Sequence, residues 1–190
     1  FHNSVVLPNG QVVIIGGQTR AAAFTDDRSV LAAELFDPVS ETVTVLPAMS
    51  VPRNYHGVSL LLPDARVITS GGGLCGAGCA ANHPDVQILS PYYLFNPDGT
   101  PAVRPGITSA PAQAGHGTSM AVTTNLPVAS FSLVRVGSTT HTVNNDQRRI
   151  PLTFTTTGAN SYGVQVPSNT GIALPGLYML FAMNADGVPS

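Results

Sequence analysis

The feature that most constrains the fold is an internal repeat in the first half of the chain. Residues 1–17 read FHNSVVLPNGQVVIIGG, and residues 55–72 read YHGVSLLLPDARVITSGG. Each copy has an aromatic-His pair, an apolar run, a Pro-Asn or Pro-Asp turn, a second apolar run and two glycines. The offset is 54 at the aromatic residue and 55 from the proline onward, which predicts one extra residue in the second copy near Ser59.

Each copy continues with two further candidate strands, at 33–38 and 42–46 in the first and at 85–89 and 92–97 in the second. Four short strands per unit, a period near 50 and a Gly-Gly pair are typical of kelch β-propeller blades. Two unrelated hairpins are the alternative. Because a propeller needs about four to eight blades, we expect the remaining blades to come from other polypeptide. Both chain ends look like cuts through a longer protein.

Composition supports a folded, turn-rich, all-β protein. Charged residues make up 9% of the 190 residues, and there are 19 glycines and 16 prolines. The apolar fraction of 43% argues against disorder. A net charge of −2 excludes a general nucleic-acid-backbone binder. No apolar run approaches the roughly 20 residues of a membrane helix, so we expect neither nucleic acid nor membrane as a partner.

The second half of the chain has a different organisation. Pro101, Pro105 and Pro111 mark a linker, after which short β-rich runs recur at 118–123, 129–136, 152–156, 161–166 and 177–183. This spacing is typical of an immunoglobulin-like sandwich. The sequence therefore predicts two domains, with propeller blades over 1–100 and a C-terminal immunoglobulin-like β-sandwich over 101–190.

Two of the five histidines have unusual surroundings. His56 directly follows Tyr55. Neighbouring side chains of a strand point to opposite faces, so both can reach one metal ion only where the strand begins or bends. His141 lies in the segment 139–151, which is too polar for a sandwich strand and suits a long loop that positions one ligand. The other histidines, His2, His83 and His116, are interpreted as structural.

The two cysteines, Cys75 and Cys79, leave two interpretations open. They suit a disulfide of a secreted protein. Half of a zinc site is the alternative, although no second pair of ligands has a matching spacing.

Several motifs together resemble those of a known family. Residues 53–67, RNYHGVSLLLPDARV, followed by GGGLC at 71–75, resemble the copper-ligand blade of the galactose oxidase family. Residues 140–151, THTVNNDQRRIP, resemble the loop that carries that family's last copper histidine, and residues 1–17 and 174–190 are similar too. The chain thus resembles the C-terminal half of a secreted copper radical oxidase. The fold implied is the last blades of a seven-bladed kelch propeller followed by an immunoglobulin-like sandwich.

The resemblance implies roles for individual residues. His56 and His141 would be copper ligands through imidazole nitrogen, and Tyr55 would be both a phenol ligand and the general base. Phe24 and Phe1 would lie at the substrate pocket. The remaining implied residues support the site: Gln147 and Arg148 would hold the loop of His141, and Cys75 and Cys79 would form a disulfide.

The implied reaction is oxidation of a primary alcohol to the aldehyde, with reduction of O2 to H2O2. The family's Tyr-Cys thioether radical cofactor belongs to an upstream segment, so we expect activity only when that segment completes the propeller. Ala23 stands where the family has a stiffer proline, and the Ala-rich rim at 21–23 suits aliphatic or aromatic primary alcohols as well as a galactose-type sugar. The alternative is a non-catalytic, carbohydrate- or protein-binding kelch and sandwich module.

Overall fold

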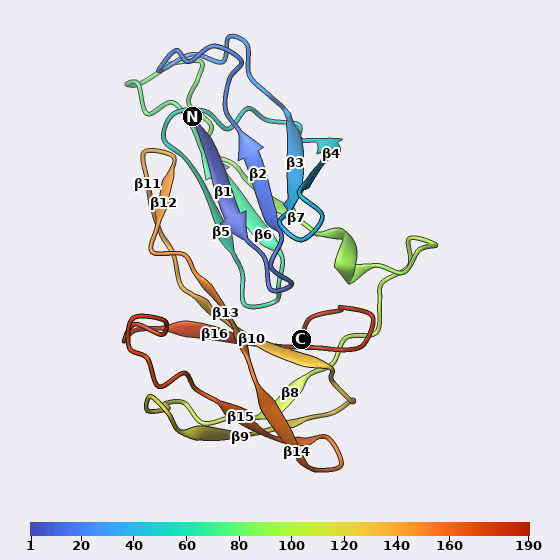
Figure 1. Cartoon of the computed structure of the whole chain (residues 1–190). Helices are drawn as coiled ribbons and strands as arrows, with labels where there is room; N and C mark the ends of the chain where they lie inside the picture. Colours follow the sequence, from blue (N-terminus) through green and yellow to red (C-terminus); the bar gives the residue numbers. More distant parts are fainter. The chain divides into compact units, whose positions relative to one another are not determined.

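The computed structural model describes all 190 residues. Apart from one 3-10 helix, η1 (Tyr92–Leu94), every regular element is a β-strand, which confirms the all-β prediction. The chain divides into two compact units: Phe1–Ser90 with Val136–Gln147, and Pro91–Arg135 with Arg148–Ser190 (Figure 1). No helix in the chain has the length and apolar character needed to span a membrane.

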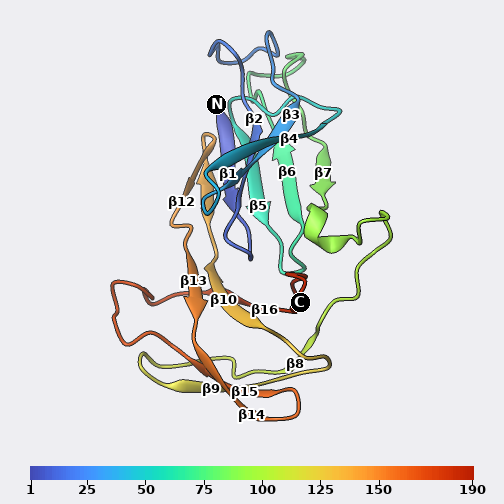
Figure 2. The ribbon, with the colours of Figure 1, turned by 45° about the vertical axis from the view of Figure 1, so that its right-hand side comes forward.

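The first unit contains two antiparallel meanders. One has four strands in the order β1 (His2–Val6), β2 (Val12–Gly16), β3 (Ala32–Asp37) and β4 (Thr42–Ala48). The other has three strands in the order β5 (Gly57–Leu61), β6 (Val67–Gly71) and β7 (Val86–Leu89), which lie side by side in Figure 2. The repeat seen in the sequence therefore corresponds to the hairpins β1–β2 and β5–β6.

The two hairpins are closed by the same turn. The amide of Leu7 donates to the carbonyl of Gln11 at 2.8 Å, and the amide of Leu62 donates to the carbonyl of Arg66 at 2.8 Å. Gly10 has φ +98° in the first turn, and Ala65 has φ +63° at the matching position of the second. The turn geometry thus imposes a left-handed backbone on an alanine.

The strand register corrects the predicted position of the extra residue. His2 pairs with Gly16 in the first hairpin, and Gly57 pairs with Gly71 in the second, so the offset is 55 along the whole of both strands. The insertion therefore precedes β5 rather than lying near Ser59, and that prediction was wrong. The structural counterpart of His2 is Gly57, and this leaves His56 outside the strand.

The fourth strand predicted at 92–97 is also wrong. The segment after β7 turns into η1, where the amide of Phe95 donates to the carbonyl of Tyr92 at 3.0 Å. Pro91 precedes the turn with φ −61°. Because proline has no N–H to donate to a strand ladder, the chain leaves the sheet at this point.

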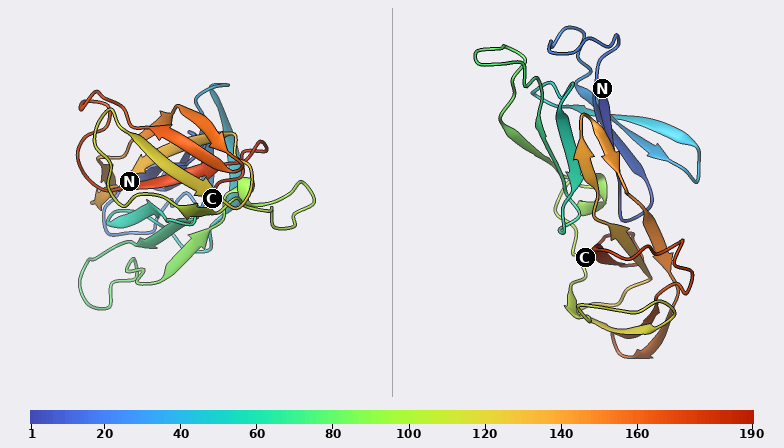
Figure 3. Two further views of the ribbon diagram at one scale, coloured as in Figure 1. Left: turned by 90° about the horizontal axis from the view of Figure 1, so that it is seen from below. Right: turned by 90° about the vertical axis from the view of Figure 1, so that its left-hand side faces the viewer.

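A further hairpin belongs to the first unit although its sequence lies far along the chain. It consists of β11 (Ser138–Thr140) and β12 (Val143–Asn145). Both strands lie against β5, and β12 also lies against β1 (Figure 3, right). The polar segment predicted as a ligand-positioning loop is thus an ordered hairpin.

The second unit is a two-sheet sandwich. One sheet has the order β13 (Arg149–Leu152), β10 (Ser130–Arg135), β16 (Tyr178–Met183), and the other has the order β14 (Phe154–Gly158), β15 (Ser161–Gln165), β9 (Ser119–Thr124), β8 (Ile107–Ser109). Residues of both sheets form one apolar core, which includes Val122, Phe131, Tyr162 and Ala182. The run predicted at 152–156 is divided at Thr153, where the chain passes from one sheet to the other.

Candidate metal centre

Five aromatic rings from four separate segments of the first unit lie together. The ring centroids of Tyr55 and His56 are 4.0 Å apart, and that of His141 is 5.0 Å from His56 and 5.9 Å from Tyr55. The structure therefore brings together the phenol and both imidazoles that the sequence singled out as metal ligands. The remaining two rings are those of Phe1 and Phe24.

Tyr55 and His56 share one side of the backbone because the chain bends between them and the strand. His56 has φ +67°, and β5 begins only at the next residue, Gly57. The amide of Gly57 closes the bend by donating to the carbonyl of Asn54 at 2.7 Å. This is the geometry that two neighbouring residues need to face one metal ion, since in a regular strand their side chains would diverge.

Gly73, in the loop that follows β6, holds this pair in place. Its amide donates to the carbonyl of Tyr55 at 2.9 Å, and its carbonyl lies 2.8 Å from Nδ1 of His56. A backbone carbonyl only accepts, so Nδ1 carries the proton and Nε2 keeps its lone pair. Gly73 itself has φ +76°, and a Cβ there would lie 2.2 Å from the carbonyl oxygen of Ala81, so only glycine fits.

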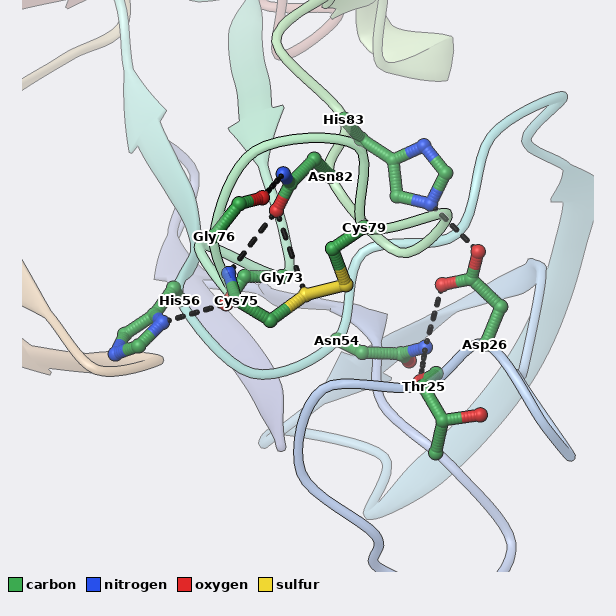
Figure 4. The surroundings of a disulfide bond; sticks show 10 residues. All are labelled: Thr25, Asp26, Asn54, His56, Gly73, Cys75, Gly76, Cys79, Asn82 and His83. Carbon is green, nitrogen blue, oxygen red and sulfur yellow. Dashed lines mark hydrogen bonds and ion pairs between the residues drawn. A yellow bond between two sulfur atoms is a disulfide. The ribbon is translucent and has the colours of Figure 1, made fainter.

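A disulfide rigidifies the segment that follows Gly73. Cys75 and Cys79 are bonded, with their Cα atoms 5.8 Å apart, which confirms the disulfide and leaves no free cysteine for a zinc half-site. The side chain of Asn82 spans the loop: Oδ1 accepts from the amide of Cys75 at 3.1 Å, and Nδ2 donates to the carbonyl of Gly76 at 2.8 Å. Figure 4 shows this loop beside the bond between His56 and Gly73.

His141 lies at the tip of the hairpin β11–β12. Thr140 pairs with Val143, so His141 and Thr142 form a two-residue turn with φ +51° and +66°. Two successive left-handed residues define the type I′ turn that matches the twist of a tight hairpin. Nδ1 of His141 lies 2.7 Å from Oγ1 of Thr140, and this leaves its Nε2 available as a ligand atom.

Polar side chains fasten this hairpin to the two sheets. Gln147 bonds β1 twice, accepting from the amide of Val6 at 3.0 Å and donating to the carbonyl of Ser4 at 2.8 Å. Asn144 donates to the carbonyl of Ser59 in β5 at 3.3 Å. The hairpin thus docks on β1 and β5, and its tip carries His141 to Tyr55 and His56.

A buried asparagine joins β1 to β5 behind the site. Asn3 is 1% exposed; its Nδ2 donates to the carbonyl of Gly57 at 3.0 Å, and its Oδ1 accepts from the amide of Ser59 at 3.3 Å. These bonds pair backbone groups that face another sheet rather than a neighbouring strand.

Arg53 anchors the segment that leads into Tyr55. Its side chain is fully buried, and it donates to the carbonyl of Gly71 at 3.0 Å and to the carboxylate of Asp85 at 2.6 Å. The hydrogen bond from Arg53 holds the pKa of the Asp85 carboxyl below its ordinary value.

Phe1 and Phe24 border the phenol and imidazoles. The ring centroid of Phe1 lies 5.0 Å from that of Tyr55, and the centroid of Phe24 lies 5.4 Å from Tyr55 and 5.8 Å from His56. Phe24 is 48% exposed and has φ +62°. Its exposed face gives this side of the site an apolar border.

The remaining predicted residues lie outside this cluster. Arg148 donates to the carbonyls of Gly171 and Ile172 at 2.8 Å within the second unit. His2 is exposed on β1, and His83 bonds the carboxylate of Asp26 at 2.8 Å. His116 contacts the carbonyl of Ala173 at 2.6 Å. The chain has no group of three or more His, Cys, Asp or Glu side chains placed to hold a metal ion.

The supporting residues were missed at the sequence level. Asn3 stands in β1 at a position that faces the core, in alternation with the buried Val5, and Arg53 and Asn54 immediately precede the Tyr-His pair. For Asn3 the available signal was its alternation with Val5 along a strand, whereas the sequence offers no signal that Arg53 and Asn54 are buried. Their partners lie in other segments, which no sequence spacing reveals.

Along its whole length the chain is similar to galactose oxidase-like proteins. The profile of the galactose oxidase-like early set domain matches residues 104–190. The whole chain is 50% identical to galactose oxidase of Gibberella zeae, of which it covers 28%. The predicted resemblance is therefore confirmed: the chain is homologous to galactose oxidase.

Two other relatives extend the comparison. An aldehyde oxidase, GLOX, of Vitis pseudoreticulata is 32% identical over 98% of this chain, which covers 39% of that protein. A solved structure of a fungal alcohol oxidase of the AA5 family, in complex with copper, superimposes with a TM-score of 0.95 and is 47% identical in sequence. The match covers the whole of this chain and 40% of the length of that protein. The chain thus spans between 28% and 40% of the length of these relatives.

Proposed function

We propose that this chain supplies the copper ligands Tyr55, His56 and His141 of a copper radical oxidase. The observation that carries the proposal is the convergence of these three rings, with centroids 4.0–5.9 Å apart, from the bend before β5 and the tip of the β11–β12 hairpin. Two imidazoles and a phenol are a donor set that suits Cu(II), and hydrogen bonds at both Nδ1 atoms leave Nε2 free. The solved relative is itself a copper complex.

Bound copper would supply Lewis acidity, which lowers the pKa of an alcohol, and a redox centre. The chain's own residues would do the rest. The phenol oxygen of Tyr55 would take the proton of the alcohol as general base, and Gly73 would hold His56 in its Nδ1–H form throughout. The second redox group, a cross-linked Tyr-Cys pair, would come from an upstream segment of the same protein.

The substrate would be a primary alcohol. The rings of Phe1 and Phe24 both lie beside that of Tyr55, and together with the Ala-rich segment 21–23 they would exclude water and accept the apolar part of an aliphatic or aromatic alcohol or of a galactose-type sugar. The alcohol would lose two electrons and two protons and become the aldehyde, and O2 would take up both to become H2O2.

The fold assignment belongs to the same proposal. Residues 1–100 would be the last blades of a seven-bladed kelch propeller, and residues 101–190 a C-terminal immunoglobulin-like sandwich. Apolar residues at 40% exposure or more on β4 and β7, namely Val43, Val45, Val86 and Ile88, would then be covered by blades of the complete protein. The disulfide and the fungal relatives support a secreted, extracellular protein.

A copper titration of the full-length protein that contains this chain tests the ligand assignment. We expect His56→Ala and His141→Ala each to weaken copper binding by at least roughly a hundredfold, while His116→Ala, a loop histidine of the second unit, stays at the wild-type value. Unchanged affinity in both site variants would sink the proposal. Copper binding without H2O2 release from galactose, butanol or benzyl alcohol would instead favour a binding module.

A further inference from the structure

His83 lies outside the proposed ligand set, yet it makes a specific contact with the segment that carries Phe24. Its Nε2 lies 2.8 Å from Oδ2 of Asp26, and the two side chains are 17% and 32% exposed. His83 follows the disulfide loop, while Asp26 follows Phe24 by two residues in the loop between β2 and β3. The contact therefore joins loops of two different sheets (Figure 4).

Asn54 reinforces this junction from the residue next to Tyr55. Its Nδ2 lies 2.8 Å from Oγ of Ser29, 3.2 Å from the carbonyl of Thr25 and 3.4 Å from Oδ1 of Asp26. The carboxylate of Asp26 thus faces His83 with one oxygen and Asn54 with the other. The loop that carries Phe24 is thus held by two segments, through Asn54 next to Tyr55 and through His83 after the disulfide loop.

The backbone of Phe24 requires such restraint. A non-glycine residue at φ +62° persists only where its surroundings hold it. Within the loop, Gln18 donates to the carbonyls of Thr25 and Asp27, both at 3.0 Å, and accepts from the amide of Ala22 at 3.0 Å. These bonds order the loop internally, and His83 and Asn54 attach it to the segments that flank the β5–β6–β7 sheet.

The backbone and the ring of His83 are both held against Gly72. Its amide donates to the carbonyl of Gly72 at 3.3 Å, and its ring packs on Gly72, where a Cβ would lie 3.2 Å from Cδ2. The next residue, Gly73, is the one that holds Tyr55 and His56. The segment of Gly72 and Gly73 therefore helps to position both Phe24, through His83 and Asp26, and the proposed ligands Tyr55 and His56.

We propose that His83 and Asp26 are positioning residues that hold Phe24 over Tyr55 and thereby set the affinity for alcohols with apolar substituents. The inference rests on the proposed function, since it names a determinant of substrate binding at that site. It acts through Phe24 and requires no contact of His83 with substrate. Loss of the contact releases the loop, and the apolar border of the site is lost with it.

Trypsin reports on the loop without any use of activity. Arg20 and Arg28 flank Phe24, and the chain contains no lysine. In the full-length protein we expect His83→Ala and Asp26→Asn to raise cleavage after these two arginines by roughly tenfold, as mapped by mass spectrometry. Asp27→Asn is the control for Asp26→Asn at the Arg20 site, because Asp27 is an exposed neighbour; it is not used at Arg28, with which Asp27 forms an ion pair.

Kinetics test the second half of the proposal. For butanol and benzyl alcohol we expect KM to rise roughly tenfold in His83→Ala, with kcat and copper affinity within about twofold of wild type. His83→Gln retains an N–H donor for Asp26 and is expected to restore both KM and trypsin resistance. His116 is another loop histidine, which contacts the carbonyl of Ala173, and His116→Ala is expected to change neither KM nor trypsin resistance.

Three results would overturn the inference: wild-type cleavage in His83→Ala, faster cleavage with an unchanged KM, or a joint loss of kcat and copper affinity that marks general structural damage. Failure of the proposed function has a different signature. In that case no variant and no wild-type sample oxidises alcohols, while His83→Ala still exposes Arg20 and Arg28 to trypsin and His83→Gln still protects them.

Discussion

Replacement of Gln147 by alanine is expected to weaken copper binding although Gln147 touches neither imidazole. The side chain bonds β1 at two points, the carbonyl of Ser4 at 2.8 Å and the amide of Val6 at 3.0 Å. Each hydrogen bond contributes about 1 kcal/mol net, so Gln147→Ala removes about 2 kcal/mol from docking of the hairpin β11–β12. His141 can ligate only from the docked hairpin, and about 2 kcal/mol corresponds to at most a roughly 30-fold higher apparent Kd for copper.

Two further variants sharpen this prediction. Gln147→Glu can still accept from the amide of Val6, but it places a carboxylate oxygen against the carbonyl of Ser4, so its effect should equal or exceed that of alanine. Asn145→Ala is the matched control, since Asn145 is an exposed residue of the same hairpin.

The assay is competition with a chelator for copper, combined with hydrogen exchange of the Val6 amide in the full-length protein. The amide of Val6 is the donor to Gln147, so it should lose protection in parallel with the loss of affinity. The reasoning is refuted if Gln147→Ala binds copper within about twofold of wild type and the Val6 amide remains protected.

Two other predictions concern the support of the Tyr55 segment. Gly16→Ala should lower the free energy of unfolding by at least roughly 2 kcal/mol, because a Cβ there would lie 2.0 Å from the carbonyl oxygen of Arg53. Gly78→Ala is the control and should cost less, since Gly78 has a similar positive φ but no atom within 4 Å of the added Cβ. Urea unfolding measures both variants, and equal losses of stability would contradict a role of the contact with Arg53. The hydrogen bond from Arg53 lowers the pKa of Asp85 in the folded state from its ordinary value of 3.8. The stabilisation of the folded state by this bond is therefore complete above pH 3.8 and is lost as the pH falls through the lower pKa of the folded state. Asp85→Asn should therefore lower Tm near neutral pH, with the difference from wild type narrowing below about pH 4; a constant difference across this range would exclude the linkage.

Much of the local structure was predictable because its causes are local. The Pro-Asn-Gly and Pro-Asp-Ala turns between apolar runs predicted the hairpins β1–β2 and β5–β6, and both are present. Four of the five runs predicted in the second half lie within one residue of a strand. Where prediction failed, at 92–97 and at Thr153, a proline or a change of sheet replaced the expected continuous strand.

The candidate site was predictable as a set of residues but not as a geometry. Tyr55, His56 and His141 were selected from an aromatic-His pair and a polar segment, and the structure places their rings together. The register error near Ser59 shows the limit of the repeat. The aromatic-His repeat aligned His2 with His56 in the sequence, whereas the strand pairing aligns His2 with Gly57. His56 therefore lies outside the strand, where a positive φ is possible and places its ring beside that of Tyr55.

The sequence by itself determined the all-β class and the hairpins, since both depend on residue types a few positions apart, and it supplied Tyr55, His56 and His141 as predicted ligands. Only the tertiary structure decided that the β11–β12 hairpin docks on β1 and β5 and that Asp26 meets His83 across 57 positions. Such contacts depend on which buried groups find partners after the sheets have packed, and no spacing along the chain encodes that.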